Sequence, residues 1–336
     1  MKKILSIGAL AFLVACGAGE TYETTPVAQN PTPEVEQAIE ELIDPTQALE
    51  ETHILITHIS GETYVPLNPT RVAVFDMGIW DTMYALGLGD YIIGGATNFL
   101  TELVDHFEVI NLGTLHEPNL ELLIEYEPEL VIISGRARPM FEELNSLVPT
   151  IDLGISNHAE FIYYFTRNTM AIAQIFGVEY RAIELLAEID ALIKETNELS
   201  AQLGEDKQAL IVLYNEGQLR AHGPNSRFGI IHDLLGVPYV DGELEIVNHG
   251  TLVSNEYVVA YDPFILFVLD RGAVITDGQA FNREDIENEL IRLTRAYQNG
   301  NIVYLNNAIW YIAPGGLQGV KLQIEEVRDA VLNSLD

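Results

Sequence analysis

The chain has 336 residues, of which 48% are hydrophobic, and a net charge of −33 from 50 acidic and 17 basic residues. This length and composition predict about two globular domains, each with its own core. A chain this acidic lacks the basic surface that nucleic-acid binding requires, which excludes that class of partner. The same negative charge makes each arginine informative, because an anionic ligand is repelled by the chain as a whole and must be attracted by local positive charges.

Residues 1–15 have the features of a lipoprotein signal peptide. Two lysines, Lys2 and Lys3, precede an apolar run that is shorter than the roughly 20 residues needed to cross a bilayer. The sequence Leu-Val-Ala-Cys-Gly that follows resembles the bacterial lipobox, which implies that Cys16 is lipidated and begins the mature chain. Cys16 is the only cysteine, so it cannot form a disulfide within the chain. We expect a monomer held by its lipid outside the cytoplasmic membrane, on the cell surface or in a periplasm.

The next part of the chain predicts a tether followed by an α/β lobe. Residues 16–52 are rich in Thr, Pro, Gln and Glu and are expected to form a flexible linker after the lipidated cysteine. Alternation around Gly61 predicts a β-hairpin over residues 53–67. The pattern then predicts strands at 71–75, 91–93 and 150–153 and helices at 77–86 and 139–147. These elements define an N-terminal lobe, residues 53–156, with a mainly parallel sheet.

The middle of the chain predicts a helical connection to a second lobe. Residues 157–204 lack proline, carry apolar residues at helical spacing and predict one long connecting helix that only Gly177 could interrupt. The C-terminal lobe, residues 205–336, then predicts strands at 209–214, 219–221 and 302–305 and helices at 230–235, 283–296 and 319–335. The expected fold class is therefore α/β, with two lobes joined by a long helix and a cleft between them.

Two stretches of the chain, Asn119–Arg136 and Ser254–Arg271, read as copies of one another. Aligned without gaps, they share a Glu, a Tyr, a Pro and a final Arg. Each copy predicts a short helix, a proline-marked turn and a buried strand that ends at the arginine. The repeat therefore predicts one arginine at the carboxyl end of a strand in each lobe, which is the edge where open α/β sheets bind ligands.

Three arginines occupy equivalent positions in this pattern. Arg136 and Arg271 end the two repeat strands, and Arg227 lies in a Gly-Pro-Asn-Ser-Arg-Phe-Gly loop that enters a helix. If the lobes face each other, their planar guanidiniums converge in the cleft, where they can bind an anion bidentately or stack on an aromatic ring. The alternative is that each forms a salt bridge with one of the many acidic residues.

Two histidines and two aromatic residues are further candidates for the same cleft. His222 and His249 flank the same region as these arginines, His249 lying in a turn just before the second repeat, and Trp310 and Tyr311 follow a predicted strand end. The alternatives are a structural role for each histidine and core packing for each aromatic ring. No His-x-His or His-Glu-x-x-His spacing predicts a dedicated metal cage. No nucleophile elbow, phosphate loop or dinucleotide fingerprint is present either, so the sequence does not predict an enzyme.

From Gly61 to the C-terminus, the chain resembles the substrate-binding lipoproteins of bacterial iron-siderophore ABC importers. These belong to the class III periplasmic binding proteins, and the likeness is to the branch that binds petrobactin and other ferric catecholates. The motifs that carry the resemblance are Asn68–Asp76, Asp81–Gly87, Gly113–Glu121, Ile132–Arg136, Gly223–Asp233, the His249-Gly250 pair and Asp270–Val274.

The resemblance implies two Rossmann-like lobes joined by a rigid helix, and a ferric siderophore held by arginines between them. It maps the binding arginines onto Arg136, Arg227 and Arg271. It also implies that a cleft histidine and tyrosine, here His249 and Tyr311, complete the iron shell when the siderophore supplies only four donors. The partners would be an ABC permease and its ATPase, with no intrinsic cofactor.

The resemblance further implies that the permease docks through one surface glutamate on each lobe. Glu121 and Glu256, which occupy the same position in the two repeats, match those docking residues. Two alternatives stay open from the residues alone: a binding protein for another metal chelate, such as cobalamin or haem, and an extracellular hydrolase on an α/β scaffold. The identity and denticity of the siderophore, and the reason for the high acidity, are not encoded in any motif.

Overall fold

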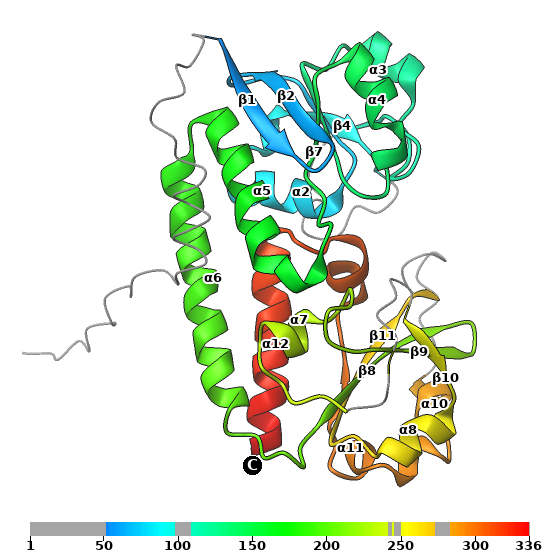
Figure 1. Cartoon of the computed structure of the whole chain (residues 1–336). Helices are drawn as coiled ribbons and strands as arrows, with labels where there is room; N and C mark the ends of the chain where they lie inside the picture. The colour runs from blue at the N-terminus through cyan, green and yellow to red at the C-terminus, as the bar shows by residue number, and fades with distance from the viewer. Residues whose placement is uncertain (1–51, 98–108, 241–243, 245–249, 273–282, 336) are drawn as a thin grey trace, which may run out of the picture.

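The structure is a computed structural model that describes residues 52–97, 109–240, 244, 250–272 and 283–335. Two α/β lobes lie one above the other, and helices run alongside both of them (Figure 1). Each lobe contains a five-stranded sheet. The predicted α/β fold class with two lobes is therefore confirmed.

The sheet of the N-terminal lobe is entirely parallel, in the order β5-β4-β3-β6-β7. Its central strands are completely buried, as expected when helices cover both faces. The predicted hairpin forms as β1 and β2 and packs on β7. The elements are β1 His53–His58, β2 Gly61–Pro66, β3 Val72–Val74, α2 Met77–Ala85, β4 Ile92–Gly95, β5 Ile110–Asn111, α3 Leu120–Tyr126, β6 Leu130–Ile133, α4 Phe141–Leu147 and β7 Thr150–Asp152.

The sheet of the C-terminal lobe is mixed, in the order β10-β9-β8-β11-β12. Its strands β8, β11 and β12 are parallel, whereas β9 and β10 are added antiparallel at one edge. The helix expected over 283–296 is instead three short helical pieces, with turns between them. The elements are β8 Ala209–Asn215, β9 Gln218–His222, α7 Ile230–Asp233, β10 Thr251–Val253, α8 Asn255–Tyr261, β11 Ile265–Asp270, α10 Arg283–Ile286, η4 Ile291–Leu293, α11 Arg295–Gln298, β12 Ile302–Tyr304, η5 Ala308–Ile312 and α12 Leu317–Leu335.

The two sequence repeats adopt the same backbone conformation. Helices α3 and α8 each begin at a side-chain cap, Asn119 and Ser254, and each has seven residues. Each ends at a left-handed residue with nearly identical angles, φ 44° and ψ 60° at Glu127 and φ 44° and ψ 59° at Asp262. A proline follows directly in both copies and prevents the helix from continuing. The chain then enters β6 or β11, so the predicted helix, turn and strand are confirmed twice.

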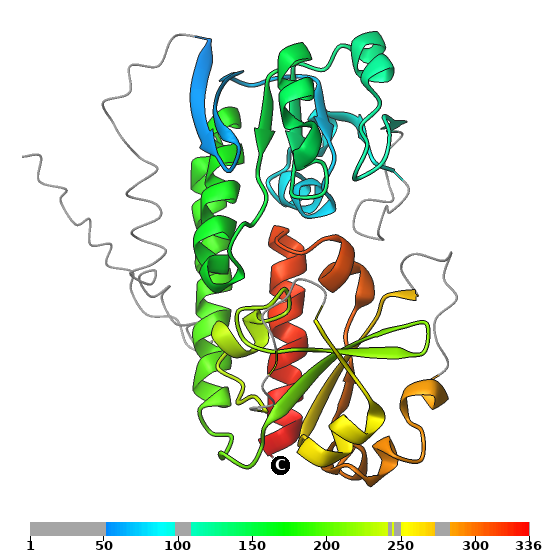
Figure 2. The same ribbon diagram turned by 45° about the vertical axis from the view of Figure 1, so that its right-hand side comes forward.

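The connection between the lobes is a pair of helices, not the single long helix predicted over 157–204. Helix α5, Phe161–Phe176, stops at Gly177, whose φ of 65° is a left-handed conformation that glycine adopts without a steric penalty. Helix α6, Glu179–Ser200, packs back on α5 and, with 22 residues, is about 33 Å long. It runs beside both lobes (Figure 1, Figure 2).

The C-terminal helix also joins the two lobes. Helix α12 packs along α6 and reaches α2 of the N-terminal lobe (Figure 2). The buried Asp81 on α2 accepts a hydrogen bond from the backbone N–H of Gly319, at 2.8 Å, in the first turn of α12. Thr82 accepts another from the N–H of Leu317, at 3.3 Å. These bonds use amide groups that a helix leaves unpaired at its start, so α12 fastens the C-terminal half to the N-terminal lobe.

Candidate functional site

A cleft of about 650 Å³ lies between the lobes and contains the three predicted arginines. Arg136 reaches it from the end of β6, Arg227 from the loop before α7 and Arg271 from the end of β11. Tyr311 and the segment that follows it form part of the wall, together with residues of α2 and α5. The expectation that these arginines converge is therefore met by the geometry.

Tyr311 gathers the three guanidiniums through two different oxygen atoms. Its carbonyl oxygen accepts hydrogen bonds from Nη2 of Arg136 at 2.9 Å and from Nη2 of Arg227 at 2.5 Å. Its phenol oxygen accepts one from Nε of Arg271 at 2.9 Å. The Arg227 guanidinium also lies over the Tyr311 ring, 4.2 Å from its centre. One residue of the C-terminal half thus orients arginines of both lobes.

The backbone around Tyr311 explains why its carbonyl is available. Residues Ala308–Ile312 form one turn of π-helix, in which the N–H of Ala313 bonds to the carbonyl of Ala308. Such a widened turn is frequent at functional sites. The carbonyls of Tyr311 and Ile312 accept from the Arg136 side chain, at 2.9 and 3.4 Å.

The electrostatics of the cleft are those of an anion site. In the described part of the chain, none of the three arginines forms a salt bridge with a carboxylate. Burial and the charges of Arg136 and Arg271 lower the pKa of the Arg227 guanidinium below its ordinary value. Burial raises the pKa of the Tyr311 phenol, but the hydrogen bond from Arg271 and the charges of Arg227 and Arg271 outweigh it and hold that pKa below its ordinary value.

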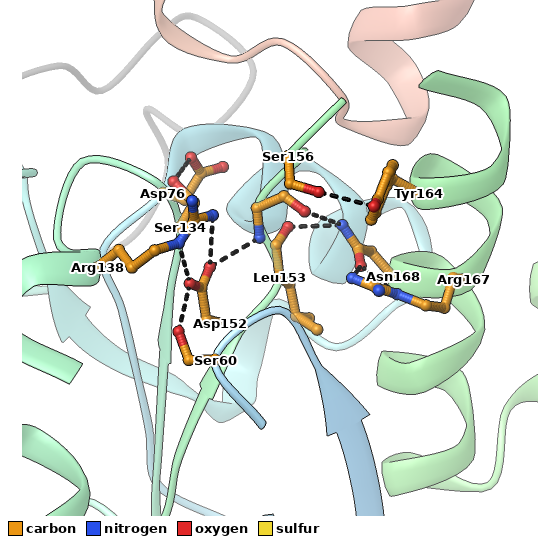
Figure 3. Close-up of polar contacts among 11 residues, drawn as sticks. Ser60, Asp76, Ser134, Arg138, Asp152, Leu153, Ser156, Tyr164, Arg167 and Asn168 are labelled. Atoms are coloured by element: carbon orange, nitrogen blue, oxygen red, sulfur yellow. Dashed lines mark hydrogen bonds and ion pairs between the residues drawn. The ribbon is translucent and has the colours of Figure 1, made fainter. Parts of the chain in front are cut away.

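The wall from the N-terminal lobe is held rigid by a polar network (Figure 3). Asp152, at the end of β7, accepts from Nε of Arg138 at 2.5 Å, from Ser60 at 2.8 Å and from the N–H of Gly154 at 3.0 Å. Asp76, the N-cap of α2, accepts from Ser134 at 2.6 Å. Both carboxylates are buried and saturated with donors, which fixes the strand ends that carry Arg136 and Arg138.

The polar residues of the cleft that were not predicted from the sequence include Asp76, Arg138 and His158. Arg138 follows Arg136 by two positions, which was the only available signal, and its pairing with Asp152 is a tertiary contact. Asp76 ends the strand-like run Val-Ala-Val-Phe-Asp, a position that could have marked it. Burial and the nearby Arg227 charge lower the pKa of His158, so its imidazole is neutral at neutral pH.

The other predicted residues lie elsewhere. Trp310 is a correction: it is 1% exposed, donates from its indole N–H to Glu326 at 2.7 Å and packs behind the cleft wall instead of lining it. Glu121 and Glu256 are exposed in the first turns of α3 and α8 and do not line the cleft. His249 and Cys16 are outside the described residues.

Comparison with known proteins identifies the class of protein. The family model described as periplasmic binding protein matches residues 72–308. The petrobactin-binding protein YclQ of Bacillus subtilis is 35% identical over 272 residues, covering 80% of this chain and 84% of that protein. The ferric-anguibactin-binding protein FatB of Vibrio anguillarum is 30% identical over 284 residues, covering 82% and 87%.

Solved structures agree with the sequence relatives. The crystal structure of YclQ superposes with a TM-score of 0.79 at 34% identity and covers 84% of this chain and 99% of that chain. The siderophore-binding protein BauB, bound to ferric iron and two molecules of acinetobactin, gives a TM-score of 0.76 at 28% identity, covering 83% and 98%. The chain therefore belongs to the periplasmic binding protein family. Its members are substrate-binding proteins, so the chain is a binding protein and not an enzyme.

Proposed function

We propose that the chain captures a ferric siderophore of the catecholate type in the interlobe cleft and delivers it to an ABC permease. One observation carries the proposal: three guanidiniums without carboxylate partners among the described residues converge on Tyr311. The related YclQ and FatB, whose names specify petrobactin and ferric anguibactin, support the same class of ligand.

The chemistry of the cleft suits this ligand. A ferric tris-catecholate carries about three negative charges, which three arginines would neutralise through hydrogen bonds worth roughly 1.5–3 kcal/mol each. Catechol rings also accept stacking and cation–π contacts from guanidiniums. A cobalamin or a haem presents less anionic oxygen, so it would leave part of this cationic cleft unpaired.

With a siderophore that supplies only four donors, we propose that Tyr311 completes the iron shell as a phenolate. Iron(III) is a hard cation that prefers oxygen donors, and the lowered pKa of this phenol favours the charged form. The resemblance assigns the second protein ligand to His249. No group of three or more His, Cys, Asp or Glu residues in the described ranges could hold a metal ion unaided, so the iron would arrive as the chelate.

Outside the cleft, we propose that Glu121 and Glu256 contact the permease. They occupy equivalent exposed positions on α3 and α8, one on each lobe. Replacing both by glutamine should leave siderophore affinity unchanged and reduce uptake of labelled ferric siderophore by cells. Normal uptake by the double variant would reject this role.

We also propose that residues 1–15 are removed, that Cys16 carries the lipid and that the segment up to residue 52 tethers the lobes outside the cytoplasmic membrane. No helix in the described ranges is long and apolar enough to cross a bilayer. Metabolic labelling with a palmitate analogue tests the anchor, since a Cys16→Ala variant should lose the label and leave the membrane fraction.

A panel titration tests the proposed ligand. Trp310 packs behind the Tyr311 segment, so iron bound in the cleft should quench its fluorescence. We expect saturable quenching by ferric catecholates and a much weaker response to the iron-free ligands. Saturable binding of haem or cobalamin, without any response to ferric catecholates, would overturn the proposal.

A further inference from the structure

A second hollow, of about 320 Å³, adjoins the cleft on the side of the C-terminal lobe. We call it the side pocket. It shares Arg227, Arg271 and Tyr311 with the main cleft, and it adds Arg220 and Asn215 from the sheet. Because the same two guanidiniums line both spaces, a ligand held in the cleft lies next to the side pocket.

The sequence builds this pocket through the alternation of two antiparallel strands. Along β9, Leu219 and Ala221 point into the core on one face of the sheet, so Arg220 projects from the other. Arg220 pairs with Leu213 of β8, and Asn215 follows on the same face two residues later. Arg220, in the middle of β9, thus faces the pocket together with the buried His222, which is two residues further along the same face.

The side pocket is cationic although the chain is strongly acidic. Three arginines line it, and no Asp or Glu is among the described residues around it. The guanidinium of Arg220 donates to the carbonyl of Gly250 at 3.2 Å, and Nη1 of Arg271 donates to Asn215 Oδ1 at 3.1 Å. These neutral oxygens orient the arginines without cancelling their charge. The chain has 50 acidic residues, so a pocket with three arginines and no carboxylate among its described lining residues is suited to an anion from outside.

We propose that the side pocket binds a carboxylate carried on an arm of the siderophore, while the iron-catecholate centre occupies the main cleft. This inference rests on the proposed function and narrows its substrate class to chelates with a free carboxylate beside the iron centre. A carboxylate matches the planar fork of a guanidinium bidentately, which an ammonium or an amide does not. The pocket has about half the volume of the cleft, which suits a small arm and not a second chelate.

The test compares two synthetic ferric complexes that differ only in this group. One ligand is bis(2,3-dihydroxybenzoyl)lysine, which has a free carboxylate, and the other is its primary amide. We expect the purified chain to bind the ferric acid at least about tenfold more tightly than the ferric amide, as one charge-assisted bidentate contact predicts. Arg220→Gln should abolish that preference by weakening the acid complex, with little effect on the amide complex.

The control variant is Arg181→Gln, which removes an exposed arginine of α6 that pairs with Glu184 and lies outside both cavities. It should keep the full preference for the acid. Thermal unfolding of each variant checks that the fold is retained. Titration of the ferric amide in excess acetate then asks whether a separate anion fills the pocket, and an increase in affinity would assign it to a free anion and overturn the arm proposal.

The possible outcomes separate this inference from the function on which it rests. Binding of neither complex would reject the proposed ferric-catecholate function itself. Equal affinity for acid and amide in the unmodified chain would keep that function and reject the side-pocket carboxylate. An equal loss for both complexes in Arg220→Gln would show that Arg220 only supports the sheet, which also overturns the inference.

Discussion

Replacing Arg227 by glutamine should weaken ligand binding without weakening the fold. The guanidinium of Arg227 donates to the Tyr311 carbonyl, lies over the Tyr311 ring and is flanked by the charges of Arg136 and Arg271. Glutamine has a similar length, can still donate a hydrogen bond and carries no charge. The substitution therefore removes the central positive charge of the cleft while preserving most of its shape.

The magnitude follows from the contacts. Loss of one charge-assisted bond to the catecholate oxygens should cost roughly 1.5–3 kcal/mol, which raises the Kd by about 10- to 150-fold. In the empty protein, the variant loses a hydrogen bond of about 1 kcal/mol and a cation–π contact of about 0.5–1 kcal/mol. The variant also removes the cost of burying the Arg227 charge and the repulsion between that charge and those of Arg136 and Arg271. We expect these effects to offset each other, leaving the free energy of unfolding within about 1 kcal/mol of the original.

Two assays report the two quantities separately. Fluorescence titration with a ferric catecholate gives the Kd, and urea unfolding followed by circular dichroism gives the free energy of unfolding. Arg181→Gln is the matched control and should change neither. A variant that unfolds more than about 2 kcal/mol more easily but binds with unchanged affinity would refute the reasoning, because Arg227 would then be a structural residue.

Two further predictions concern titratable groups at the centre of the structure. Tyr311→Phe removes the phenol that accepts a hydrogen bond from Arg271. The affinity for a tetradentate ferric catecholate should therefore fall far more than the affinity for a hexadentate one. Equal losses of affinity would show that the phenol does not coordinate iron. Burial raises the pKa of Asp81 to about 6, above its ordinary value, so the folded state binds the proton more tightly than the unfolded chain and stability rises as pH falls through 6. Between pH 8 and pH 5 this group should add about 1.4 kcal/mol to the free energy of unfolding. Urea unfolding should show that Asp81→Asn lacks this gain. The same gain in both proteins would mean that other carboxylates produce it.

Much of the site could be predicted from the sequence because its parts depend on local structure. The repeated helix, turn and strand follow from a capping residue, a left-handed residue and a proline within a few positions of one another. The strand ends then place Arg136 and Arg271 at the ligand edge, whichever residues pack behind them. The break at Gly177 is equally local, although the sequence pattern alone favoured one continuous helix.

The sequence by itself thus determined the two α/β lobes, the repeated unit and the cationic character of the cleft. Only the tertiary structure decided that the carbonyl of Tyr311 orients arginines of both lobes, that Trp310 lies behind the wall and that Asp152 holds Arg138. The physical reason is that capping and strand alternation act over a few residues, whereas these contacts join residues from 14 to 175 positions apart. The contact from Arg136 to Tyr311 depends on how helices α6 and α12 bring the lobes together, which no short stretch of sequence specifies.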